Sequence, residues 1–147
     1  MRDAAATFLR HLRQAVRLLP EPLGPPLRAA QTELRRNLQL AFNLASAHHR
    51  PVVIEPLRGA TEGRLRLHLP AGVCWGRPQD IPLPPSLAGS GWGNGHPRPL
   101  TVMPRRRAAA NVWFLHHGRQ ALCLRLDLSG TVELLRYRPR LRAWTRC

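Results

Sequence analysis

Residues 111–138, "NVWFLHHGRQALCLRLDLSGTVELLRYR", decide the fold class of this chain. Three apolar stretches rich in Leu, Val and aromatic residues are separated by two short groups of turn-forming residues. This pattern is typical of β-strands joined by tight turns. It predicts an antiparallel meander of three strands, at residues 111–117, 121–128 and 131–138.

The first turn sets the register of the meander. A two-residue turn at Gly118-Arg119 places Leu115 opposite Leu122. The same register places Trp113 opposite Leu124. The residues that then share one buried face are Trp113, Leu115, Leu122, Leu124 and Leu126. The other face of the sheet is expected to carry arginine.

The second turn, around Ser129-Gly130, leaves the register of the third strand open. A two-residue loop places Glu133 on the apolar face, whereas a three-residue loop places Leu134 there. The local sequence contains no feature that selects one of these two loops.

Residues 52–69 predict a β-hairpin upstream of the meander. The stretch "VVIEPL" at 52–57 is rich in β-branched residues, although Pro56 restricts it to an edge strand or a short one. The stretch "GRLRLHL" at 63–69 alternates, so its leucines face one way and Arg64, Arg66 and His68 face the other. The residues "GATEG" between them are typical of a hairpin loop.

Two helices are predicted in the N-terminal third. Residues 3–19 repeat apolar side chains at helical spacing. Residues 26–48 carry a second apolar stripe, formed by Leu27, Ala30, Leu34, Leu38, Ala41 and Ala45. The short Pro-Gly connection between the two favours an antiparallel helical hairpin. An Arg-rich, acid-poor N-terminus is also typical of an organelle transit peptide, which would be removed from the mature protein.

Two segments remain outside these elements. Residues 70–110 contain eight prolines and six glycines and predict a long loop or insertion, and residues 139–147 form a basic tail. The chain length suits one domain. The sequence therefore predicts a single α+β domain over residues 1–147, with the helical hairpin packed on an antiparallel sheet.

The charge of the chain indicates the class of partner. There are 23 basic and eight acidic residues, which give a formal net charge of +15, and every basic residue is arginine. A GC-rich codon preference accounts for arginine in place of lysine, but not for the scarcity of acids. A field this positive attracts polyanions. The expected partner is nucleic acid, RNA or DNA, with an acidic protein as the alternative.

Arginine and aromatic residues together indicate how nucleic acid is bound. The guanidinium fork grips phosphate with two hydrogen bonds, and aromatic rings stack on unpaired bases. No helix-turn-helix or zinc finger is evident, so RNA or another single strand is preferred to duplex DNA. The predicted function is non-catalytic binding of such a strand. The residues expected at the interface are Arg64, Arg66, Arg105, Arg106, Arg107, Arg125, Arg136, Tyr137, Arg138, Arg140, Arg142 and Trp144.

Two other functions fit the sequence less well. The first is a protein–protein assembly module, which would present an exposed apolar patch beside the Pro-Gly loop and pair its arginines with a partner's acids. The second is a small metal-independent ribonuclease, similar in its elements to toxin ribonucleases. In that case the base, the acid and the phosphate-binding cation would come from His117 or His68, Tyr137, and Arg125 or Arg136.

No cofactor or metal is predicted. The pairs His48-His49 and His116-His117 lack the spacing of a zinc site. The three cysteines are odd in number and form no C-x-x-C motif, so a reducing compartment, the cytoplasm, is expected. No apolar run reaches the roughly 18 residues of a membrane span. The sequence leaves the oligomeric state open.

Overall fold

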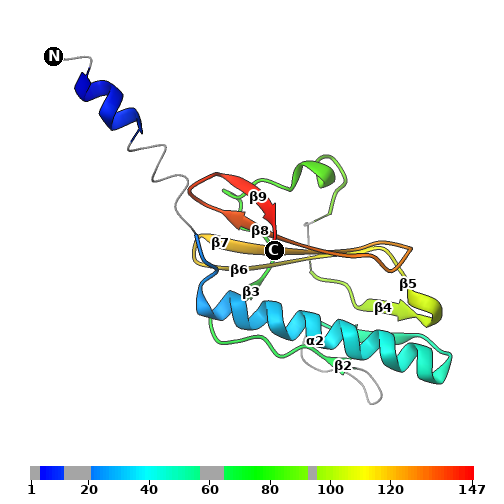
Figure 1. Cartoon of the computed structure of the whole chain (residues 1–147). Helices are drawn as coiled ribbons and strands as arrows, with labels where there is room; N and C mark the ends of the chain where they lie inside the picture. Colours follow the sequence, from blue (N-terminus) through cyan, green and yellow to red (C-terminus); the bar gives the residue numbers. More distant parts are fainter. Residues whose placement is uncertain (1–3, 12–20, 57–64, 93–95) are drawn as a thin grey trace.

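The computed structural model describes residues 4–11, 21–56, 65–92 and 96–147. It confirms the α+β class (Figure 1). One sheet has the strand order β2-β1-β4-β5, and its strands are β1 (Val52–Glu55), β2 (Leu65–Arg66), β4 (Leu100–Met103) and β5 (Arg107–Ala108). The other has the order β3-β6-β7-β8-β9, and its strands are β3 (Cys74–Trp75), β6 (Asn111–His117), β7 (Gln120–Leu126), β8 (Val132–Arg138) and β9 (Ala143–Arg146).

The meander of β6, β7 and β8 has the predicted order and register. Trp113 pairs with Leu124 and Leu115 with Leu122, so the two-residue turn at Gly118-Arg119 is confirmed. In the second turn Leu124 pairs with Leu134, which corresponds to the three-residue loop. That loop keeps Leu134 on the apolar face, because side chains alternate along each strand.

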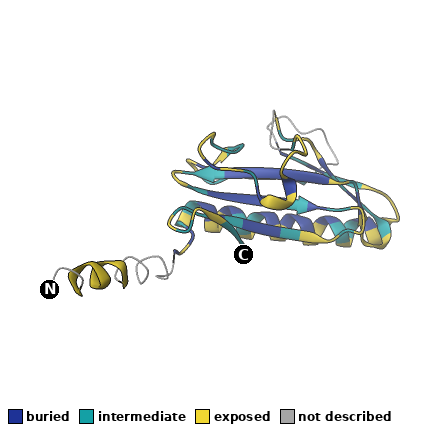
Figure 2. Ribbon diagram, turned by 90° about the horizontal axis from the view of Figure 1, so that it is seen from above, coloured by how far each residue is buried: buried dark blue, intermediate teal, exposed yellow. Residues whose placement is uncertain are grey.

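Helix α2 (Pro25–His48) covers this apolar face. Its six predicted stripe residues are all buried, and they pack in one cluster with Trp113, Leu115 and Leu124. The helix also packs on β1 and β4, so it bridges the two sheets. Figure 2 shows the buried residues gathered between α2 and the strands. The prediction of a helix at 26–48 is confirmed, with Pro25 and Pro26 in the first turn, where a missing N–H costs nothing.

The N-terminal helix predicted at residues 3–19 is described over residues 4–11, and residues 12–20 lie outside the described residues. Every residue of 4–11 is exposed, including Phe8 at 65% and Leu9 at 54%. This helix stands away from the sheets in Figure 1, so α2 supplies the helical layer within the described part of the chain.

The second face of β6, β7 and β8 carries apolar side chains, not the arginines predicted for it. Val112, Phe114, Cys123 and Leu135 are buried there. Leu83, Leu87 and Trp92, from the segment that contains the 3-10 helix η1 (Pro85–Leu87), cover them. Burial raises the pKa of the Cys123 thiol to about 12, and the nearby charge of Glu133 adds to the rise. Cys123 is therefore a core residue.

The β-hairpin predicted at residues 52–69 is wrong. Strand β1 pairs with β2 in parallel, and on its other side it pairs antiparallel with β4. The antiparallel partner lies far along the chain because it buries more apolar surface. Ile54, 1% exposed, lies opposite Leu100, which is fully buried. Residues 57–64, which include Arg64, lie outside the described residues.

Two segments expected to be irregular contain strands. Residues 70–110 hold β3, β4 and β5, together with η1 and the 3-10 helix η2 (Pro104–Arg106), so they are not simply a loop. The predicted basic tail at 139–147 contains β9, which pairs with β8 and places Trp144 opposite Tyr137. Both rings are held against the second face of the sheet, and this packing recruits the tail into the fold.

Glu21 anchors the chain where it enters α2. Its carboxylate is 5% exposed, accepts a hydrogen bond from the Arg140 backbone N–H at 2.6 Å and lies 3.4 Å from Arg138 Nε. The Glu21 backbone oxygen accepts a hydrogen bond from Arg136 Nη1 at 2.6 Å. Gln120 bonds the backbone of Pro22 and Gly24 in the same connection. The start of α2 is thereby fixed to the ends of β7 and β8.

We predict that Glu21→Ala lowers the free energy of unfolding by about 1.5–3 kcal/mol, the range for hydrogen bonds to a charged group. The buried Arg138 Nε would lose the carboxylate it faces. Urea denaturation followed by circular dichroism measures the change. Asp80→Ala, which removes an exposed acid, is the control and should shift stability by less than about 0.5 kcal/mol. Equal effects of the two changes would contradict an anchoring role for Glu21.

Candidate nucleic-acid interface

The arginine turn, Arg105 to Arg107, is the most exposed of the predicted arginine groups. All three residues are exposed, and none forms an ion pair with a carboxylate in the described part of the chain. Arg105 and Arg106 have positive φ angles of 63° and 55°, a backbone conformation that costs non-glycine residues about 1–2 kcal/mol. Such strain persists only where the surrounding structure imposes it.

The β7–β8 loop imposes the shape of the arginine turn. A Cβ atom at Gly130 would lie 2.0 Å from the backbone oxygen of Arg106, so only glycine allows this approach. The loop itself is held by Asp127, whose Oδ1 accepts hydrogen bonds from the backbone N–H groups of Ser129 and Thr131, each at 3.0 Å. It also accepts one from the Ser129 hydroxyl at 2.6 Å. The two turns therefore form one packed unit.

Arg35 on α2 lies across a groove from this unit. We call it the α2 groove, and it has a volume of about 480 Å³. Its walls are one flank of α2, the arginine turn and the β7–β8 loop. The lining residues are Arg35, Leu38, Gln39, Phe42, Arg106, Ser129, Gly130, Thr131 and Val132. Two arginines and no carboxylate line it, so the groove favours an anion.

Most of the predicted tail arginines are engaged within the protein. Arg136, Arg138 and Arg140 surround Glu21, as described above. Arg142 is exposed and shares a separate hollow with Arg119 and Arg140 at the other end of β8. A strand of this length spans roughly 20 Å at 3.3 Å per residue. The tail and the arginine turn are therefore two basic surfaces, not the one continuous interface predicted.

The aromatic residues predicted to stack on bases are packed inside the protein. Tyr137 is 8% exposed, and its ring centroid lies 5.6 Å from that of Trp144. Trp144 also lies 6.0 Å from Phe114, and its indole N–H donates to the Pro82 carbonyl at 2.8 Å. These contacts occupy both rings with the second face of the sheet.

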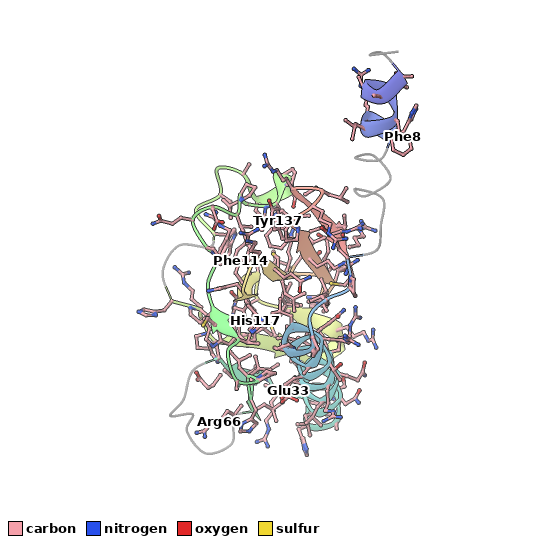
Figure 3. All side chains as sticks on the ribbon, turned by 90° about the vertical axis from the view of Figure 1, so that its left-hand side faces the viewer. Phe8, Glu33, Arg66, Phe114, His117 and Tyr137 are labelled. Carbon is pink, nitrogen blue, oxygen red and sulfur yellow. The ribbon has the colours of Figure 1, made fainter. Side chains whose placement is uncertain are left out.

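The remaining predicted residues are dispersed. Arg66 is exposed on β2, and Figure 3 shows it at the opposite end of the molecule from Tyr137. Arg125 is half-buried on β7, opposite Glu133 of β8. Arg64 lies outside the described residues. Of the predicted interface residues, the structure brings together Arg105, Arg106 and Arg107, and it adds Arg35.

The residues of the ribonuclease alternative do not meet. His117 pairs with Gln120 on the face that α2 covers, whereas Tyr137 lies on the other face of the same sheet. The alternation of side chains along a strand separates them. His68 is exposed near β2, in another sheet. The geometry therefore assembles no base–acid pair from these residues.

Metal and membrane signals follow the same limits. Among the described residues, no three His, Cys, Asp or Glu side chains gather into a metal-binding cluster. The three cysteines are free thiols, with Cys74 and Cys147 exposed. No helix within the described ranges has both the length and the apolar character needed to cross a bilayer.

Comparison with known proteins adds no further indication. No protein-family model matches the chain, and searches of curated proteins and of solved structures found no significant match. The function must therefore be argued from the geometry of this chain.

Sequence reasoning missed Arg35 and Phe42. Both lie on one flank of the α2 stripe, seven residues apart, which is two turns of a helix. A helical wheel of residues 26–48 would have placed them together. The strand or turn facing that flank depends on the packing of segments more than 60 residues away, which local periodicity does not report.

We predict that Gly130→Ala destabilises the protein and displaces the arginine turn, because the added Cβ meets the Arg106 carbonyl. Gly89→Ala is the matched control, since Gly89 has a similar φ of 75° and no atom within 4 Å of an added Cβ. The control should cost about 1–2 kcal/mol for the backbone alone, and Gly130→Ala should cost more. Thermal unfolding of both variants measures the difference, and equal costs would show that the contact with Arg106 has no consequence.

The stability given by Asp127 should depend on pH. Its hydrogen bond from the Ser129 hydroxyl, with those from the Ser129 and Thr131 backbone, lowers the pKa of the Asp127 carboxyl. A group with a lowered pKa in the folded state stabilises the protein above its unfolded pKa, about 3.9, and loses this effect as the pH falls through the folded value. The Tm difference between the protein and Asp127→Asn should thus be full at neutral pH and shrink in acid. A difference that stays constant from neutral pH into strong acid would exclude this linkage.

Proposed function

We propose that the protein binds nucleic acid without catalysis, through arginine contacts to phosphates centred on the arginine turn. The observation that carries the proposal is the exposure of Arg105, Arg106 and Arg107 in a strained turn that Gly130 and the β7–β8 loop hold in shape. Exposed, unpaired guanidinium groups are the side chains best suited to phosphate. The net charge of +15 supports the same class of ligand.

The geometry favours a mode of binding different from the one predicted. Tyr137 and Trp144 are engaged within the protein, so the tail contributes charge but no base stacking. Affinity should therefore come chiefly from counterion release. If six to ten phosphates are contacted, affinity should fall by roughly 10³–10⁵ between 50 and 200 mM salt. We place this activity in the cytoplasm, where the three free thiols would stay reduced.

The test is fluorescence anisotropy with labelled single-stranded RNA, single-stranded DNA and duplex DNA over a salt series. Replacing Arg105, Arg106 and Arg107 by Ala should weaken binding and reduce the slope of log affinity against log salt by roughly 2–3, because three phosphate contacts are lost. Thermal stability should change little, since these side chains are exposed.

The matched control removes the same charge elsewhere. Arg98, Arg119 and Arg142 are also exposed and form no printed ion pair, and they lie outside the arginine turn. Their replacement by Ala should change the slope by less than one. If both triple variants weaken binding equally, the charge acts as a whole and the arginine turn has no special role. If none of the three nucleic acids binds with a steep salt slope, an acidic protein partner becomes the better assignment.

A further inference from the structure

The α2 groove has a feature that phosphate binding alone does not need. Its floor is apolar: Leu38 is buried, Phe42 is half-buried, and Val132 is 37% exposed. Leu128, at the tip of the adjoining loop, is 70% exposed. Phosphates alone would leave this apolar surface in water, so the ligand of the groove should carry an apolar part as well as a charge.

The two kinds of chemistry lie on opposite sides of the groove. Arg35 comes from α2 and Arg106 from the arginine turn, and Phe42 lies on the α2 flank below them. The Gln39 amide donates a hydrogen bond to Asn43 Oδ1 at 3.0 Å, which leaves the Gln39 oxygen as an acceptor at the wall. A flat apolar group with polar edges, joined to an anion, fits this arrangement.

We propose that the α2 groove takes one unpaired nucleotide of the strand that the arginine turn holds. The base lies against Phe42, Leu38 and Val132, and the adjoining phosphate lies between Arg35 and Arg106. This inference rests on the proposed function, because Arg106 belongs to both surfaces. It extends that function by making the ligand a single strand, or a duplex with an unpaired base.

Size and charge support this occupant. A volume of about 480 Å³ is within the range of small-ligand sites, roughly 300–1,000 Å³. No carboxylate lines the groove, and the nearby acids are already engaged: Asp127 within its own loop and Glu133 with Arg146 at 3.8 Å. An acidic peptide would also meet the arginines. The aromatic ring at the floor and the planar guanidinium groups favour a base.

The test compares three labelled oligonucleotides: a single strand, its full duplex, and the same duplex with one unpaired nucleotide. The single strand and the bulged duplex should bind more tightly than the full duplex. Phe42→Ala should weaken these two by roughly 5- to 150-fold, the range for loss of one stacked base, and leave the full duplex unchanged. Phe42→Leu keeps the floor apolar and the core filled but removes the ring, so it should show the same selectivity with a smaller loss.

Leu40→Ala is the matched control. Leu40 lies on α2 two residues from Phe42, is 44% exposed and does not line the groove, so its replacement should leave all three affinities unchanged. If both Phe42 variants bind all three oligonucleotides as the unchanged protein does, or weaken all three equally, the nucleotide site is overturned while the proposed function stands. If the unchanged protein binds none of them, the proposed function fails and this inference with it. Binding of an acidic amphipathic peptide, lost in Phe42→Ala, would then assign the groove to a protein partner.

Discussion

Both faces of β6, β7 and β8 are apolar, and most of the structure follows from this constraint. A sheet that is apolar on two sides needs two covering layers. Helix α2 covers one face through its leucine and alanine stripe, and the segment around η1 covers the other through Leu83, Leu87 and Trp92. The second layer explains why a proline- and glycine-rich segment is packed. It also explains why β9 folds back, since Trp144 completes the same cover.

The same constraint decides where the arginines lie. With both sheet faces apolar, 23 arginines must occupy turns, strand ends and the outer side of α2. The few acids then determine which arginines are neutralised. Glu21 gathers Arg136, Arg138 and Arg140 at one end of β8. No described acid pairs with the arginine turn at the other end, so the positive field is strongest where a strained and rigid turn presents it.

The sequence predicted the elements that depend on local pattern. The pairing of Trp113 with Leu124 followed from alternation and a two-residue turn, and the α2 stripe followed from helical spacing. It did not predict pairings between distant segments. The choice of Leu100, not residues 63–69, as the antiparallel neighbour of Ile54 depends on burial that no local signal reports. Tyr137 and Trp144 were assigned to solvent for the same reason, because the segment that covers them lies more than 50 residues earlier.

The candidate site shows the same division between local and distant effects. The triplet of arginines was visible in the sequence, but its shape depends on Gly130, 24 residues later, and the groove depends on the flank of α2, about 70 residues earlier. Asp127 links these parts, because its carboxylate is satisfied by three hydrogen bonds inside the β7–β8 loop. A carboxylate used in this way shapes the loop and holds its charge within it. The acid closest to the arginine turn along this wall therefore builds the groove, and Arg35 and Arg106 remain free to bind an anion.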